Sequence, residues 1–153
     1  MSLREFLVKA KAKTYASEGE RNGRQLEDGG TELTFRDAKY VYRDRYYGVN
    51  PFASEEIVWQ DGRTVWATNY HGGVTDDAIL PADVYLFLRS ALRNVEAARP
   101  FRGGPREFSD GLYTYRDQNT GDLDRFSGRE AISFQGREVY SLHYHGGSLA
   151  SGS

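Results

Sequence analysis

The residues of this chain that could carry chemistry occur in two copies. Tyr40–Asp44 has the sequence YVYRD and recurs as YTYRD at Tyr113–Asp117, and the YHGG stretch Tyr70–Gly73 recurs at Tyr144–Gly147. Self-similarity of this kind indicates an internal repeat, which has to be recognised before a fold is predicted. Arginine, aspartate, tyrosine and histidine can bind anions, transfer protons or hold metals, so each motif has a functional and a structural interpretation.

Arg43 and Arg116 occupy the same place in the two copies, in segments that alternate like β-strands. Successive side chains of a strand point to opposite faces, so Tyr42 and Asp44 share a face and Arg43 lies on the other. As a binding site, either arginine would clamp an anion beside a wall of tyrosines. As structure, the motif would form cross-strand pairs that fix the register, and its repetition favours this second interpretation.

Four acidic residues are candidates for acid–base chemistry: Asp44 and Glu56 in the first copy, and Asp117 and Glu130 in the second. Hydrolytic chemistry often uses two carboxyl groups held near each other, and two related halves could supply them. Acidic side chains are more often exposed or paired with arginine, so we expect these roles for most of them.

His143 is the most unusual histidine, because the first copy has Asn69 in its place. His143 and His145 are two residues apart and would project from one face of a strand, a spacing that metal sites can use. A metal would need a third ligand such as Glu130 or Asp117, and the sequence does not establish where these lie. We therefore predict no metal site and no cofactor.

The two copies differ in several aromatic residues, and such differences could shape a pocket for an asymmetric small molecule. Tyr47, Trp59 and Trp66 in the first copy correspond approximately to Thr120, Ser133 and Tyr140 in the second. Aromatic side chains line many ligand pockets, although they also fill ordinary cores. The predicted ligand-binding residues are Arg43, Tyr47, Trp59, Trp66, Arg116 and His143.

Two helices and two groups of strands must position these residues. Ser2 and Glu5 form a capping-box pattern that begins a helix over residues 2–16, with Lys11 on its solvated cationic face. Pro81 begins a second helix, which Arg99-Pro100 stops, and residues 17–30 are predicted to form a long loop. The YHGG glycines are expected to end strands through positive φ angles. Period-two patterns predict strands at 32–35, 40–47, 55–60, 63–70, 107–108, 112–117, 126–134 and 137–144.

The connection between the second helix and the second group of strands is rich in arginine. Arg99, Arg102 and Arg106 flank Gly103-Gly104 and could bind an anion. We expect this connection to face solvent, where arginines are common, so these three residues alone do not indicate an anion site.

The order of elements predicts an α+β fold that is internally duplicated. Each unit would contain one helix and three or four antiparallel strands, with both helices packed on one face of the sheet and the halves related by a pseudo-twofold axis. We expect a single domain over residues 1–153, with repeat one at 2–75, repeat two at 81–148 and a flexible tail at 149–153.

Composition limits the classes of function. The 153 residues include no cysteine, which excludes disulfides, a thiol nucleophile and thiolate-bound metals. The net charge of −2 argues against autonomous nucleic-acid binding. The sequence contains no run of about 18 apolar residues, the length that is needed to cross a bilayer. We expect a cytoplasmic protein without membrane contact.

Several short stretches together resemble an uncharacterised bacterial and archaeal domain family of unknown function. They are residues 42–46, Phe101-Arg102-Gly103, Phe126-Ser127-Gly128 and the second YHGG motif. The resemblance covers residues 1–148. In that family the domain also follows an XRE-type helix-turn-helix in transcription regulators, a module that this chain lacks because its first helix runs straight into strands.

The resemblance implies a sensory or ligand-binding role, and we predict a small-molecule-binding or regulatory domain without catalysis. Two alternatives stay open. The first is a small hydrolase or isomerase that uses Asp or Glu with His143. The second is a protein-interaction module that forms a homodimer through its sheet or its helices.

Overall fold

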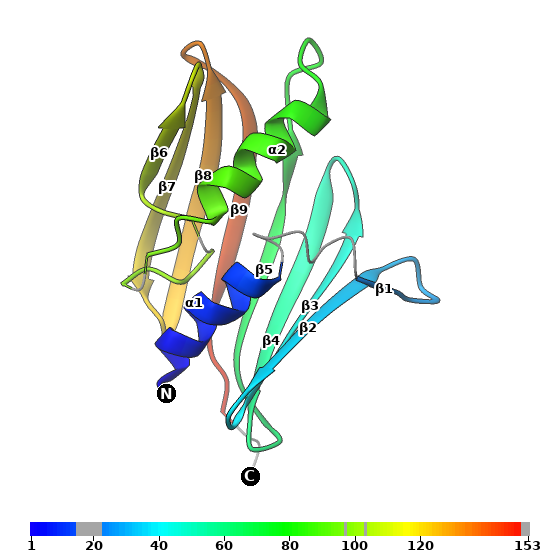
Figure 1. Ribbon diagram of the computed structural model, residues 1–153, viewed down its shortest axis with the longest axis vertical. Helices are drawn as coiled ribbons and strands as arrows, with labels where there is room; N and C mark the ends of the chain where they lie inside the picture. The colour runs from blue at the N-terminus through cyan, green and yellow to red at the C-terminus, as the bar shows by residue number, and fades with distance from the viewer. Residues whose placement is uncertain (15–22, 97, 103, 151–153) are drawn as a thin grey trace.

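In a computed structural model of the chain, the residues described are 1–14, 23–96, 98–102 and 104–150. They form one antiparallel sheet of nine strands in the order β1-β2-β3-β4-β5-β9-β8-β7-β6, with two helices against one of its faces (Figure 1). The elements are α1 (Leu3–Lys13), β1 (Arg24–Gln25), β2 (Thr31–Asp37), β3 (Tyr40–Gly48), β4 (Phe52–Gln60), β5 (Arg63–Val74), α2 (Pro81–Leu92), β6 (Glu107–Asp110), β7 (Tyr113–Asp122), β8 (Arg125–Phe134) and β9 (Arg137–Ser148).

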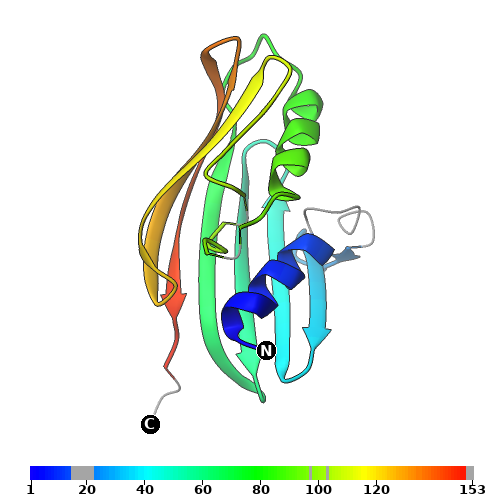
Figure 2. The same ribbon diagram turned by 60° about the vertical axis from the view of Figure 1, so that its left-hand side comes forward.

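The sheet is continuous because β5 and β9 pair along their length. Trp66 lies opposite Ser148 at one end of this pairing and Val74 lies opposite Tyr140 at the other. Strands β2–β5 therefore form one side of the sheet and β6–β9 the other. We call the face that carries the helices the inner face, and the opposite one the outer face (Figure 2).

The predicted α+β fold, a duplicated unit of one helix and three or four strands, is wrong. The structure is a single nine-stranded antiparallel sheet with two short helices, and strand residues far outnumber helical ones. The prediction gave the helices too much weight, because α1 ends at Lys13 rather than residue 16 and α2 ends at Leu92. It also made most strands too short, so the long β5–β9 pairing that joins all strands into one sheet was missed.

The helices dock through their apolar stripes. Ser2 and Glu5 form the predicted capping box, with Ser2 Oγ accepting from the Glu5 backbone N–H at 3.1 Å. Phe6 of α1 stacks on Tyr40 of β3 with a centroid distance of 4.9 Å, and Phe87 of α2 stacks on Tyr113 of β7 at 5.0 Å. Aromatic stacking thus fixes one helix over each side of the sheet.

The YHGG glycines were expected to end strands, and this prediction is wrong. Gly72 and Gly73 lie within β5, and Gly146 lies within β9. A Cβ atom on Gly72 would overlap the backbone of Ser141 and Leu142 on β9. These glycines therefore permit close approach of two strands rather than a turn.

The loop predicted over residues 17–30 contains a short strand in its second half. Arg24–Gln25 forms the two-residue strand β1, which pairs with Thr31 and Glu32 of β2. Residues 17–22 and the last three residues of the predicted tail lie outside the described residues. In the part of the chain described, neither helix is long and apolar enough to cross a bilayer.

Replacing Gly72 with alanine should destabilise the protein, because the new methyl group meets the β9 backbone. Overpacking of this kind typically costs about 1–3 kcal/mol. Urea denaturation should show the loss in the free energy of unfolding. His71→Ala, at the exposed neighbouring position on β5, should change that free energy by less than about 0.5 kcal/mol. Equal effects of the two substitutions would contradict the close approach of β5 and β9.

Candidate ligand-binding site

The inner face of the sheet carries a buried set of charged residues, which we call the buried charge set. Its seven members have relative exposures of 8% or less. Four are acidic and three are basic: Asp44, Glu56, Asp117, Glu130, Lys11, Arg99 and Arg102. Buried charges are rare unless they are paired, so the partners of each member decide what this region can do.

Strand register brings the acids together in two pairs. Asp44 lies opposite Glu56 on β3 and β4, and Asp117 lies opposite Glu130 on β7 and β8. Side chains directly opposite each other in an antiparallel sheet are close neighbours on one face. Like charges in such a position repel, so each pair needs cations or protons to balance it.

Glu56 is neutralised by α1. Lys11 Nζ lies 2.7 Å from Glu56 Oε1 and 3.1 Å from the hydroxyl of Tyr70. Tyr42 donates to the same Glu56 oxygen at 2.5 Å. Glu56 Oε2 is buried and has no hydrogen-bond donor among the described residues. The placement of Lys11 on a solvated face was wrong, since it is completely buried.

Glu130 is neutralised by the connection that follows α2. Arg102 Nε lies 3.1 Å from Glu130 Oε2, and the guanidinium stacks on Tyr70 at 4.8 Å from the ring centroid. Tyr115 and Tyr140 donate to Glu130 at 2.5 and 2.7 Å. Arg102 is therefore buried and occupied by a carboxylate, so the expectation that this connection faces solvent is wrong at Arg102.

Asp117 accepts a hydrogen bond from Tyr144 and pairs with Arg99. Tyr144 donates to Asp117 Oδ1 at 2.7 Å, and Arg99 Nη2 lies 3.7 Å from Oδ2. Burial raises the pKa of Asp117 to about 6, although the Tyr144 hydrogen bond and Arg99 oppose the shift. Asp117 is thus ionised at neutral pH with a cation beside it.

Asp44 is the member of the buried charge set that has no cation as a direct partner in the described part of the chain. Ser54 donates to Asp44 Oδ1 at 2.7 Å. Burial, and secondly the charge of Glu56, raise the pKa of Asp44 to about 7. At neutral pH this carboxyl group is therefore close to half protonated.

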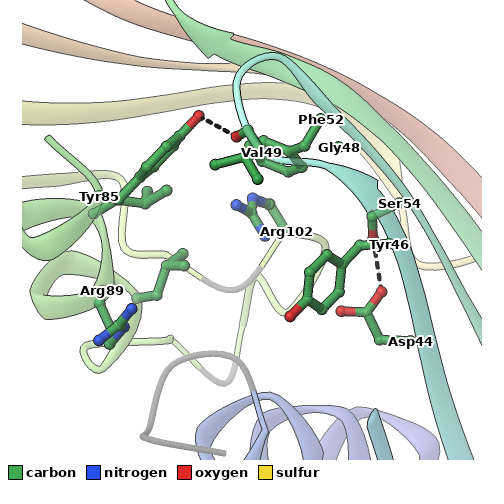
Figure 3. Close-up of a pocket in the computed structure, with 11 residues that line it drawn as sticks. Asp44, Tyr46, Gly48, Val49, Phe52, Ser54, Tyr85, Arg89 and Arg102 are labelled. Carbon is green, nitrogen blue, oxygen red and sulfur yellow. Dashed lines mark hydrogen bonds between the residues drawn. The ribbon is translucent and has the colours of Figure 1, made fainter. Parts of the chain in front are cut away.

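Asp44 lines a cavity of about 310 Å³ between α2 and strands β3 and β4 (Figure 3). Its apolar walls come mainly from Phe52, Leu88 and Leu92, and polar groups come from Tyr46, Ser54, Arg89 and Arg102. Val49, Gly48 and Tyr85 complete the lining. A mixed lining around a buried carboxyl group is typical of small-molecule sites.

The six residues predicted to bind a ligand lie outside this cavity. Arg43 and Trp59 meet on the outer face, where the guanidinium lies 5.0 Å from the indole centroid. Arg116 is exposed and lies 3.6 Å from Glu107. Strand alternation separates Arg43 and Arg116 from the acids next to them.

The other three predicted residues have different surroundings. The hydroxyl of Tyr47 donates to Asp28 Oδ2 at 2.7 Å near the sheet edge. Trp66 is completely buried and donates to the Leu123 carbonyl at 3.1 Å. His143 is exposed on the outer face, opposite His71 on β5. The structure does not bring His143 to the four acids, which lie on the inner face.

Sequence reasoning missed Lys11, Tyr46 and Tyr85. Lys11 follows Leu7 by four positions and precedes Thr14 by three, and both of these residues are buried, so helical spacing placed it on the inward stripe. Tyr46 shares a strand face with Asp44, which the period-two pattern shows. For Tyr85 the sequence holds no signal, because the cavity forms only when α2 docks.

Within the described ranges, no group of three or more His, Asp or Glu side chains is arranged to hold a metal ion. His143 and His145 share the outer face of β9, as their spacing predicted, without a third ligand there.

Comparison with known proteins gives one match. The model of a domain of unknown function, DUF5680, matches residues 44–149. This confirms the resemblance to a family of unknown function, over a shorter stretch than residues 1–148. No curated protein and no solved structure matches the chain.

Replacing Lys11 with methionine should strongly destabilise the fold, because Glu56 would remain as a buried charge without its cation. Breaking a buried ion pair from one side typically costs about 3–5 kcal/mol. The double variant Lys11→Met/Glu56→Gln should recover much of the loss. Lys9→Met, which removes an exposed pair with Asp37, should cost less than about 1 kcal/mol in the same chemical denaturation series. Comparable losses at Lys9 and Lys11 would contradict the role of Lys11.

Replacing Asp44 with asparagine should stabilise the protein increasingly as pH rises from 5 to 8. Asp44 keeps its proton in the folded state up to about pH 7 but loses it near pH 4 when unfolded. Between these two pH values the folded state binds one proton more than the unfolded state. The free energy of unfolding of the wild type therefore falls by about 1.4 kcal/mol per pH unit in that range. The gap between variant and wild type should widen by on the order of 2–3 kcal/mol.

Asp28→Asn is the control for this pH series. The hydrogen bond from Tyr47 lowers the pKa of Asp28, so its contribution is already complete above pH 4. The stability difference between Asp28→Asn and the wild type should stay constant from pH 5 to 8. A constant difference for Asp44→Asn as well would show that Asp44 is ionised throughout.

Proposed function

We propose that this chain, which belongs to the DUF5680 family of domains of unknown function, is a small-molecule-binding domain of the sensor type without catalysis. The observation that supports this most directly is the cavity between α2 and strands β3 and β4. Its volume of about 310 Å³ is at the lower end of ligand pockets, which hold molecules of metabolite size.

The lining divides into two parts that suit an amphipathic ligand. Phe52, Leu88 and Leu92 provide an apolar wall, whereas Asp44 and Ser54 provide a polar end. Apolar contact supplies most of the affinity in such sites, and a few placed polar groups supply orientation. The regulatory part of the proposal rests on the resemblance to domains that follow XRE-type helix-turn-helix modules.

We favour binding over the hydrolase or isomerase alternative. That alternative pairs an acid with His143, and His143 lies on the outer face of the sheet. A general base has to lie within hydrogen-bond reach of the proton that it removes. The alternative of a module that forms a homodimer through its sheet or its helices does not account for the cavity.

Thermal-shift screening of a metabolite library tests the proposal, with Ser54→Phe as the variant that fills the cavity. A ligand present at 100 times its Kd stabilises the folded state by about 2.7 kcal/mol, or on the order of 5–10 °C in Tm for a domain of this length. True ligands should lose this shift in Ser54→Phe.

Ala53→Phe is the matched control, because Ala53 is the neighbouring residue on β4 and is exposed on the outer face. It introduces the same side chain without entering the cavity, so the Tm shift should persist. If every hit shifted the Tm of both variants equally, binding would occur elsewhere and the cavity would not be the ligand site.

A further inference from the structure

The buried charge set contains one more acid than it contains cations. Three of the acids pair with cations: Glu56 with Lys11, Glu130 with Arg102 and Asp117 with Arg99. Asp44 is the acid left over, with Ser54 as its hydrogen-bond donor in the described chain. Within the buried charge set, the acids therefore outnumber the cations by one when Asp44 is ionised.

The same place is also short of hydrogen-bond donors. Ser54 occupies one oxygen of Asp44, and Figure 3 shows the other oxygen directed away from Ser54, toward the side chain of Tyr46. Glu56, directly across the strand pair, has a buried Oε2 without a donor in the described part of the molecule. Carboxylate oxygens are strong acceptors, so a donor that also carries positive charge would satisfy both deficits.

The charged and titratable groups around Asp44 in the described part of the chain come from several elements. Glu56 faces it from β4, Lys11 from α1 and Arg102 from the connection after α2. Lys11 and Arg102 are each held within 3.1 Å of a glutamate. Tyr46, Tyr85 and Arg89 are the remaining such groups of the lining. Tyr85 and Arg89 come from α2, and Arg89 is half-buried. An anionic ligand placed against Asp44 would add a second negative charge beside that carboxylate.

The cavity walls suit a cation with an apolar body. Tyr46, Phe52 and Tyr85 contribute aromatic rings, and ring faces attract ammonium groups. Leu88 and Leu92 add aliphatic surface from α2. The polar end at Asp44 and the apolar wall lie in one enclosure, so one molecule can contact both.

We infer that the ligand is an organic cation, a protonated amine with a small apolar body, whose ammonium group lies against the Asp44 carboxylate. This inference rests on the proposed function and specifies its ligand class. The ammonium group donates to Asp44, and the apolar body packs against Phe52 and Leu88. Binding excludes the proton that Asp44 otherwise holds, so protons and amine compete for the same carboxylate.

Three probes of matched size test the charge requirement by isothermal titration calorimetry: benzylamine, benzyl alcohol and benzoate. At pH 8 benzylamine should bind roughly tenfold or more tightly than benzyl alcohol, and benzoate should bind most weakly. Lowering the pH to 5.5 should weaken benzylamine binding by about 30-fold, because Asp44 becomes protonated while the amine stays charged. The affinity for benzyl alcohol should change little.

Asp44→Asn tests the residue itself. The variant should bind benzylamine no better than benzyl alcohol, and its affinity for benzylamine should no longer depend on pH. Its thermal unfolding, measured alongside, checks that it is folded. If benzylamine binds the variant as tightly as the wild type, or does not bind the wild type, the inference is overturned.

The failure of this inference can be told apart from failure of the proposed function. If benzyl alcohol or benzoate binds best, and Ser54→Phe abolishes that binding, the cavity is a ligand site and only the cationic class is wrong. If all three probes bind Ser54→Phe and the wild type equally, both proposals fail.

Discussion

The structure depends on carboxylates that are buried on a sheet and neutralised by cations from outside it. Glu56 receives Lys11 from α1, and Glu130 receives Arg102 from the connection after α2. Each carboxylate alone would cost several kcal/mol to bury, so the sheet tolerates them only while these segments stay docked. Apolar packing such as Phe6 on Tyr40 is less directional, whereas a hydrogen-bonded ion pair fixes where a segment lies. We therefore assign these pairs to the positioning of the inner layer more than to net stability.

The two sides of the sheet use the same acids in the same register with different results. Asp117 lies opposite Glu130 as Asp44 lies opposite Glu56. Tyr144 and Arg99 lie against Asp117, whereas Asp44 lines the cavity. The two pairs thus differ in their surroundings and not in the acids themselves, since Asp117 has Arg99 beside it and Asp44 borders the cavity.

The sequence predicted local features well, whereas the surroundings of the cavity depend on how the helices dock. The capping box at Ser2 and most strand positions follow from residue types and spacing. The YHGG glycines misled because a glycine pair reads equally as a turn or as close strand contact, and only the partner strand decides. Of the aromatic residues that differ between the copies, Trp59 lies on the outer face and Trp66 in the core, so neither lines the cavity. Asp44 and Glu56 were recognisable as candidate acids, but the sequence did not predict that they lie opposite each other. Their surroundings depend on α2 and on Arg102, which tertiary docking alone brings near.

Asp44 itself separates a structural from a functional interpretation of the inner face. If its role were only to accept the Ser54 hydrogen bond, asparagine would do so without the repulsion from Glu56 and without a charge to bury. An acid in this place destabilises the folded state at neutral pH unless something positive fills the space beside it. Lys11 and Arg102 are each held by a glutamate. A proton neutralises Asp44 below about pH 7, and above it the cavity beside Asp44 leaves room for a positive charge from outside the buried set.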